Sequence, residues 1–302
     1  MEKLQIDSLE DLSINGIKQW IYIRSCNKNN PVLLFLHGGP GFPGIAAAQA
    51  YQSGLEKRFT VVQWDQRGAG KSYSPTIPKE TMNINQFVSD LYELVNHIKN
   101  RLKCQKVYLI GHSWGAMLGI LAVKQHPELF NCFISVGQLV NHKLASEVRY
   151  PFLLEEAKKH GDIEAITKIE GSNGWGMVEY EYSVKFGGAF NGKSDTNQLI
   201  NIFFGNNTLY TDSEKQSIPN GMGFSDESMW DEIHTINLLI TADKIDIPVL
   251  FISGKHDKLT PTEVVTKYYE TLEAPKKKDF VFWKIGTFSI SRRNRLFLWG
   301  NK

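Results

Sequence analysis

Cysteine is scarce in this sequence, and its spacing excludes two kinds of small stabilised domain. The three cysteines, Cys26, Cys104 and Cys132, are odd in number and form no C-x-x-C pair. Neither a disulfide framework nor a zinc knuckle has this pattern. We therefore expect a protein of a reducing compartment, the cytoplasm, with no metal ion and no other cofactor.

Long apolar runs and an excess of charge of one sign are also lacking. The uninterrupted apolar stretch at residues 32–36 has five residues, far below the ~18 of a membrane span. Residues 1–20 contain no apolar core of the ~7 to 15 residues that a signal peptide needs. With 34 Lys and Arg against 32 Asp and Glu, the formal charge of +2 is too close to neutral to favour a nucleic acid or a membrane as partner.

What is present is a chain of 302 residues, 42% of them hydrophobic, which can bury one large core or two ordinary ones. Short apolar runs alternate with helical segments from residue 17 to about 137, the order that builds a mostly parallel sheet covered by helices. The clearest helix is expected at 83–102, where apolar residues recur at steps of three and four. The expected strands are residues 17–23, 32–36, 59–64, 107–110, 133–136 and 247–252.

Residues 139–246 have a different composition. They are rich in Glu, Asn, Gly and aromatic residues, and their apolar positions have helical rather than strand spacing. We expect a helical insertion at 139–246, and a core formed by residues 1–138 and 247–302.

The strongest signal for chemistry is the segment Gly111-His112-Ser113-Trp114-Gly115, which follows an apolar strand and precedes a helical segment. This is the G-x-S-x-G pattern in the context that it requires. Glycine is needed on both sides because the serine lies in a tight, strained turn where flanking side chains would collide. We expect Ser113 to be a nucleophile whose hydroxyl lies above the sheet, at the positive end of a helix.

A second segment can supply the groups that stabilise an oxyanion. The strand at 32–36 runs into His37-Gly38-Gly39-Pro40-Gly41, whose small residues let backbone N–H groups approach a substrate oxygen. Acyl transfer needs two such donors for its tetrahedral intermediate. We expect them to be the N–H groups of Gly39 and of Trp114, the residue after the nucleophile.

A third segment, WDQRGAGKS at 64–72, ends like a phosphate-binding P-loop. Asp65 stands where that pattern needs its first glycine, so the pattern fails there. An NTPase is the alternative of another class, which a nucleotide-binding assay would test. The segment has instead a structural interpretation, in which Asp65 pairs with Arg67 and holds the loop beside the active site.

HGGPG, WDQRGAGKS and GHSWG, in this order and spacing, resemble the proline iminopeptidase branch of the α/β-hydrolase superfamily. The resemblance extends from about Ile17 to the lysines at 276–278 and is weak in the insertion. It implies an α/β-hydrolase fold, with an eight-stranded, mostly parallel sheet and a helical cap formed by the insertion. The implied activity is removal of an N-terminal residue, commonly proline, from small peptides, or hydrolysis of another small amide or ester.

The resemblance also implies roles for three acidic residues. It places the acid of the catalytic triad at Asp257, after the strand at 247–252; such an acid orients the histidine and stabilises its cation. It further implies that carboxylates of the cap hold the free amino terminus of the substrate, and Glu179 and Glu181 are the candidates. The alternative for each glutamate is an ordinary place on a solvated helix face.

The histidine of the triad is missing from its expected place. The chain order of this fold requires a base after Asp257, yet every histidine precedes that residue. His256 is its direct neighbour at a strand end, where adjacent side chains point to opposite sides. The eight histidines are His37, His97, His112, His126, His142, His160, His234 and His256.

The sequence after the lysines at 276–278 suggests why the histidine is missing. If the DNA encoding residues 279 onward is read one nucleotide forward, a suitable choice of synonymous codons encodes another sequence with a histidine at the place of Thr287. That sequence is Ile-Leu-Phe-Phe-Gly-Lys-Ser-Ala-His-Phe-Pro-Tyr-Leu-Glu-Glu-Ile-Asp. This has the family's spacing from the lysines to the base. Our hypothesis is that residues 279–302 are a frameshifted version of the family's ending. They would replace the last core strand and helix, which predicts lower stability and a tendency to aggregate.

Two functions therefore remain open. The first is a serine hydrolase of a small amide or ester, impaired because its serine has no base; ~10³ to 10⁴ of rate enhancement over water can remain from the oxyanion donors and binding alone. The second is a catalytically dead relative that binds a small molecule or a partner through its cap. Neither function calls for a nucleic acid or a membrane.

Overall fold

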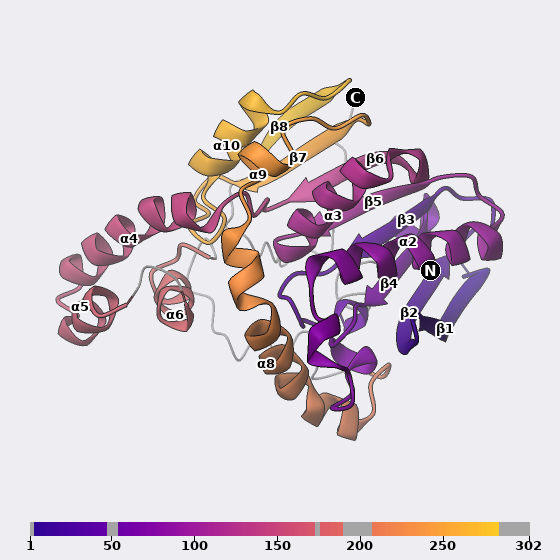
Figure 1. Cartoon of the computed structure of the whole chain (residues 1–302), viewed down its shortest axis with the longest axis horizontal. Coiled ribbons are helices and arrows are strands. Elements are labelled where there is room, and N and C mark those ends of the chain that lie inside the picture. The colour runs from indigo at the N-terminus through magenta and orange to yellow at the C-terminus, as the bar shows by residue number, and fades with distance from the viewer. Residues whose placement is uncertain (1–2, 47–53, 173–175, 190–206, 284–302) are drawn as a thin grey trace.

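The structure, a computed structural model, describes residues 3–46, 54–172, 176–189 and 207–283. One eight-stranded sheet runs through this part of the chain, in the order β1-β2-β4-β3-β5-β6-β7-β8 (Figure 1). Strand β2 is antiparallel to both of its neighbours, and every other adjacent pair is parallel. This is the mostly parallel sheet of an α/β-hydrolase fold, as the sequence predicts.

The elements alternate along the chain as expected for a sheet covered by helices. The strands are β1 (Ile6–Ile14), β2 (Ile17–Ser25), β3 (Val32–Leu36), β4 (Thr60–Asp65), β5 (Val107–His112), β6 (Phe130–Val136), β7 (Val249–Gly254) and β8 (Lys277–Trp283). The α-helices are α2 (Ile84–Leu102), α3 (Trp114–Gln125), α4 (His142–Lys159), α5 (Ile163–Glu170), α6 (Met177–Lys185), α8 (Asp212–Thr235), α9 (Leu238–Thr241) and α10 (Thr262–Thr271).

Each of the six strands located from the sequence is present within a few residues of its predicted bounds. Two further strands, which the sequence pattern did not locate, complete the eight that the resemblance implies. β1 forms an antiparallel hairpin with β2 at one edge of the sheet. β8 forms the other edge, paired in parallel with β7. The expectation that residues 279–302 replace the last core strand is wrong for residues 279–283, which belong to β8. The physical reason is that strand pairing uses backbone groups, which a segment rich in aromatic and β-branched residues can supply whatever its origin.

Helices α2 and α3 lie side by side against the sheet (Figure 1). The expected amphipathic helix is α2, which begins after Asn83, whose side chain accepts a hydrogen bond from the N–H of Gln86; such a cap stabilises a helix by about 1 kcal/mol. α3 is buried along most of its length. The rings of Phe87 on α2 and Trp114 on α3 meet edge to face at 5.6 Å, which fixes the start of α3 against its neighbour.

Between β6 and β7 the described residues form helices α4, α5, α6, α8 and α9. Figure 1 shows α4 and α5 extending away from the sheet. Helices α4 to α6 enclose a small core of their own, whereas Met229 and Ile233 on the last turns of α8 belong to the main core. The small core consists of Leu153, Ala157, Ala165, Ile169 and Tyr182. In the described part of the chain, no helix has the length and apolar character needed to cross a membrane.

Candidate active site

Ser113 lies in a sharp turn between the end of β5 and the start of α3. Its backbone has φ 55° and ψ −115°, a left-handed conformation that L-residues other than glycine rarely adopt. Its N–H donates to the carbonyl of Val136 at 2.9 Å, which ties the turn to the end of β6. The hydroxyl-bearing residue is therefore held at the carboxyl edge of the sheet, directly before the N-terminus of a helix.

The two glycines of the pattern are required by packing. A Cβ on Gly111 would lie against the carbonyl of Gly115, and a Cβ on Gly115 would lie against the carbonyls of Leu36 and His37. Backbone atoms cannot move aside as a flexible side chain can. The steric prediction made from the sequence is confirmed. The turn at residues 111–115, called the elbow from here on, is so tight that α3 touches the end of β3.

The loop after β3 passes beside the elbow. A Cβ on Gly38 would lie 2.9 Å from Nδ1 of His112, the residue before the serine. Gly39 has φ 117°, which glycine adopts without strain. Trp114 is the first residue of α3, where N–H groups have no acceptor within the helix. Both residues expected to donate to an oxyanion thus belong to segments that flank the Ser113 turn.

A hydrogen-bonded bridge, which the sequence analysis missed, holds this loop to the elbow. The N–H of Gln66 donates to Nε2 of His37 at 3.0 Å, and Nε1 of Trp114 donates to Oε1 of Gln66 at 3.0 Å. Nδ1 of His37 lies 2.8 Å from the carbonyl of Gly38. Burial lowers the pKa of His37 to about 4, so its ring is neutral and donates from Nδ1. Since both nitrogens are engaged, His37 serves the structure of the site.

The predicted pairing of Asp65 with Arg67 is wrong. Nε and Nη2 of Arg67 donate to the two oxygens of Asp90 on α2, at 2.8 and 3.0 Å. Both side chains are buried, and Asp90 also accepts from Gln19 at 2.7 Å. Arg67 reaches Asp90 because a bidentate partner on α2 satisfies its planar donors, which Asp65 cannot do while its own oxygens are occupied.

Asp65 instead accepts hydrogen bonds from two backbone N–H groups and from a side chain of the insertion. It accepts from the N–H groups of Ile45 and Lys71, at 2.9 and 2.8 Å, and from the hydroxyl of Tyr210 at 2.6 Å. Burial raises the pKa of Asp65 to about 6, while these donors act in the opposite direction. Nζ of Lys71 in turn contacts Glu214 at 2.7 Å. The loop after β4 is thus fastened to the segment that leads into α8.

The expected acid, Asp257, lies in a turn just after β7 and is fully buried. Its Oδ1 accepts from the N–H groups of Leu259 and Thr260, both at 2.9 Å, and its Oδ2 accepts from the hydroxyl of Thr260 at 2.8 Å. These bonds fix the orientation of the carboxylate. His256, beside it, is exposed.

The structure distinguishes the two glutamates of α6. Glu181 is exposed, as its solvated-face alternative predicts, whereas Glu179 is 1% exposed. Oε1 of Glu179 accepts from the hydroxyl of Ser172, and Oε2 has no hydrogen-bond partner among the described residues. A Cβ on Gly176 would lie 3.6 Å from that oxygen and 3.9 Å from the ring of Trp230. The solvated alternative is therefore wrong for Glu179, which faces the interior of the insertion.

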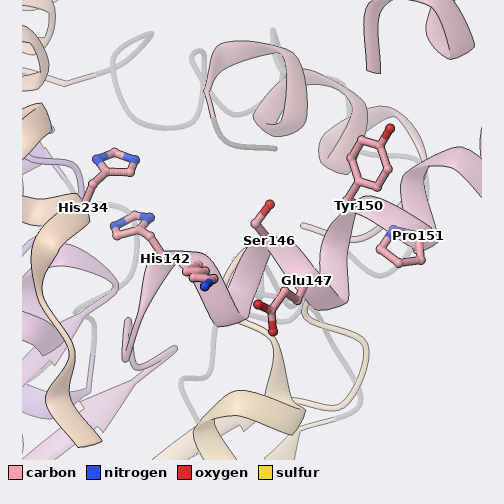
Figure 2. A pocket seen from close by; sticks show the side chains of 7 residues that line it. His142, Ser146, Glu147, Tyr150, Pro151 and His234 are labelled. Atoms are coloured by element: carbon pink, nitrogen blue, oxygen red, sulfur yellow. The ribbon is translucent and has the colours of Figure 1, made fainter. Parts of the chain in front are cut away.

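An open cleft of roughly 530 Å³ lies between α4 and the end of α8. Figure 2 shows Ser146 and Tyr150 pointing to the same side of α4, with the rings of His142 and His234 close together at one end. These rings stack at 4.1 Å, and Trp230 stacks on His234 at the same distance. The lining residues are His142, Lys143, Ser146, Glu147, Tyr150, Pro151 and His234. Among the described residues no cluster of three or more His, Cys, Asp or Glu could hold a metal ion.

The position expected for the base, Thr287, lies outside the described residues. The segment from 284 to 302, to which the frameshift hypothesis mainly applies, lies outside them as well.

Comparison with known proteins defines the family. Residues 31–163 match the model of the α/β hydrolase fold family. The probable aminopeptidase YbaC of Bacillus subtilis is 36% identical over 290 residues, which cover 93% of this chain and 91% of that protein. The chain therefore belongs to the α/β-hydrolase superfamily.

Other relatives match over shorter stretches or by fold alone. A probable proline iminopeptidase of Leptolyngbya boryana is 31% identical over 117 residues, covering 39% of this chain and 34% of that protein. A proline iminopeptidase-related protein of Thermus thermophilus has a TM-score of 0.63 at 17% identity, covering 89% of this chain and 88% of that one. A putative lipase of Acinetobacter baumannii also has a TM-score of 0.63, at 16% identity, over 93% and 85%. At these identities the solved structures show the fold.

Proposed function

We propose that this chain is built as a serine hydrolase that removes an N-terminal residue, most readily proline, from small peptides or related amides. Ser113 is the nucleophile, Asp257 is the acid, and the N–H groups of Gly39 and Trp114 stabilise the oxyanion. The observation that carries the proposal is the strained Ser113 turn at the start of α3, closed by glycines that packing requires. Strain of this kind persists where function needs it. The similarity to a probable aminopeptidase over nearly the whole chain supports an amide substrate.

Glu179 is the better anchor for the substrate's amino terminus. A buried carboxylate oxygen without a hydrogen-bond partner is costly, and a substrate ammonium group would supply the missing donor. Trp230, beside it, offers an apolar face for the ring of a proline. Glu181 is exposed and has no such role. The cap that carries this anchor is the insertion at 139–246.

The chain as it stands is an incomplete catalyst. Acyl transfer requires a base that takes the proton of the Ser113 hydroxyl as it attacks the carbonyl carbon. His37 has both ring nitrogens engaged and His256 is exposed. The missing base is the histidine that the shifted frame places at Thr287. The catalytically dead binder is the second candidate, and the specific observation in its favour is that no histidine follows Asp257.

A comparison of two forms of the protein tests both candidates. One is the 302-residue chain, and the other is encoded by the same DNA read one nucleotide forward at codon 279. We expect only the second form to hydrolyse L-prolyl-p-nitroanilide and to be labelled at Ser113 by a fluorophosphonate, while the N-acetylated substrate remains intact. A shifted form that folds, as judged by circular dichroism, but shows neither reaction would favour the binder.

The coding DNA tests the frameshift directly. We expect the codons from 279 onward to be those synonyms that give Ser-Ala-His in the shifted frame. Synonymous codons that do not encode Ser-Ala-His in the shifted frame would refute the frameshift hypothesis. The binding protein would then be the better functional assignment.

The two glutamates of α6 form a matched pair for the anchor. In the active form, Glu179→Gln removes a charge-assisted bond to the substrate's ammonium, worth about 1.5 to 3 kcal/mol, so we expect KM to rise about 10- to 100-fold. Glu181→Gln makes the same chemical change on the exposed face and should leave KM unchanged. Equal effects of the two substitutions would contradict the assignment.

A further inference from the structure

Arg149 is a buried cation between the cap helices and the loop that carries Asp257. It lies on α4 and is 0% exposed. Its Nη1 donates to the carbonyl of Leu259 at 3.2 Å, two residues after Asp257. Figure 1 shows α4 running away from the sheet, and this hydrogen bond ties its middle to the loop after β7.

Two buried carboxylates act on the guanidinium of Arg149. They belong to Glu179 on α6 and to Asp257, which are 1% and 0% exposed. Burial lowers the pKa of Arg149 to about 9, and the two carboxylates oppose that shift. Arg149 is therefore charged at neutral pH, and it is the cation that these two anions share. Among the described residues, Arg149 also acts on His142, whose pKa is lowered to about 2 by burial, by His234 and by Arg149, so that ring is neutral.

The loop after β7 has a second attachment to the cap. The N–H of Lys258 donates to the carbonyl of Gly188 at 2.7 Å. A Cβ on Gly188 would lie 2.9 Å from Cβ of Lys258 and 3.0 Å from the ring of Phe152. Residues 258 and 259, directly after the acid, are thus both held by segments of the insertion.

We propose that Arg149 is a positioning residue that joins the substrate anchor to the catalytic acid. Its buried guanidinium is the counter-charge to the two buried carboxylates, and through the carbonyl of Leu259 it fixes the acid loop against the cap. The roles given to the two carboxylates rest on the proposed function. The electrostatic linkage itself does not, so it can be tested on the 302-residue chain without any turnover.

The test is a double-variant cycle in urea unfolding, measured at pH 8 and pH 5. Arg149→Met leaves two buried carboxylates without their cation, which raises their folded-state pKa values above the ~4 of the unfolded chain. A raised carboxyl pKa costs stability at high pH, and the cost falls as the pH drops through it. We expect the urea midpoint of Arg149→Met to lie well below that of the unchanged protein at pH 8, and the gap to shrink by at least half at pH 5.

The substitution Glu179→Gln tests which negative charge causes the loss of stability of Arg149→Met at pH 8. Added to Arg149→Met, it removes one of the two unpaired anions and should restore at least half of the midpoint lost at pH 8. The contribution of His142 is the same in both variants and cancels in this comparison. Arg67→Met is the matched control, because it breaks another buried pair, with Asp90; Glu179→Gln should restore nothing there.

Arg149→Lys keeps the charge and loses the planar donors. Its midpoint should fall, while its difference from the unchanged protein should be the same at pH 8 and pH 5. If Arg149→Met does not fold, the test uses Arg149→Lys instead. The proposal is overturned if the Arg149→Met gap is independent of pH and unaffected by Glu179→Gln, or if Arg149→Lys shows a gap that shrinks at pH 5. Failure of the proposed function would appear separately, as a shifted-frame form that hydrolyses nothing.

Discussion

The strain stored at Ser113 predicts that one substitution abolishing the nucleophile makes the protein more stable. A non-glycine residue at φ 55° and ψ −115° costs about 1 to 3 kcal/mol. Ser113→Gly releases that strain, while the added freedom of glycine in the unfolded chain costs about 0.5 to 1 kcal/mol. Taking the middle of each range, the expected net gain is about 1 kcal/mol. Ser113→Ala also removes the hydroxyl but keeps a Cβ, so the strain remains and no such gain is expected.

Urea unfolding of the two variants, followed by far-ultraviolet circular dichroism, measures the difference. Both lack the hydroxyl, so any loss of its hydrogen bonds is common to them, and the difference in free energy of unfolding reports the backbone. We expect the free energy of unfolding of Ser113→Gly to exceed that of Ser113→Ala by about 1 kcal/mol. Equal midpoints, or a less stable glycine variant, would refute the argument that the elbow is strained.

Two further predictions concern the surroundings of the elbow. Gly115→Ala places a methyl group against the carbonyls of Leu36 and His37 and should lower the free energy of unfolding by about 1 to 3 kcal/mol. The control is Gly223→Ala in α8, whose new Cβ meets no neighbouring atom within 4 Å and should raise the free energy of unfolding by about 0.5 to 1 kcal/mol. Urea midpoints that move in the same direction for both variants would contradict this prediction. Because the pKa of His37 falls from 6.5 to about 4 on folding, the unfolded chain binds the proton first as the pH drops below 6.5, and by pH 4 the folded state loses about 3 kcal/mol of stability. His37→Gln should flatten the fall in stability between pH 7 and pH 4, and an unaltered pH profile would show that His37 is not the group that titrates.

Much of the fold and of the elbow could be predicted from the sequence because the signals are local. Strand and helix periods, the glycines around Ser113 and the turn after β7 are each set by neighbouring residues. β1 escaped prediction because an antiparallel edge strand has a weak pattern, and its partner β2 makes it a strand. β8 escaped because the resemblance ended before it, although its backbone still pairs with β7.

The pairing of charges could not be predicted in the same way. Asp65 and Arg67 stand two residues apart and invite a local pair, yet Asp90, 23 residues beyond Arg67, takes its guanidinium. The difference between Glu179 and Glu181 depends on which side of α6 packs against α4 and α5, and no period in that short helix reveals it.

By itself, the sequence determined the order of elements, the strained serine between two required glycines, and the absence of any histidine after Asp257, because covalent order and local sterics fix these features. Only the tertiary structure decided which buried charges share a partner. Arg149 carries no motif and lies 108 residues before Asp257. It becomes important because folding removes water from three charged groups, so that the carboxylates of Glu179 and Asp257 act strongly on its guanidinium.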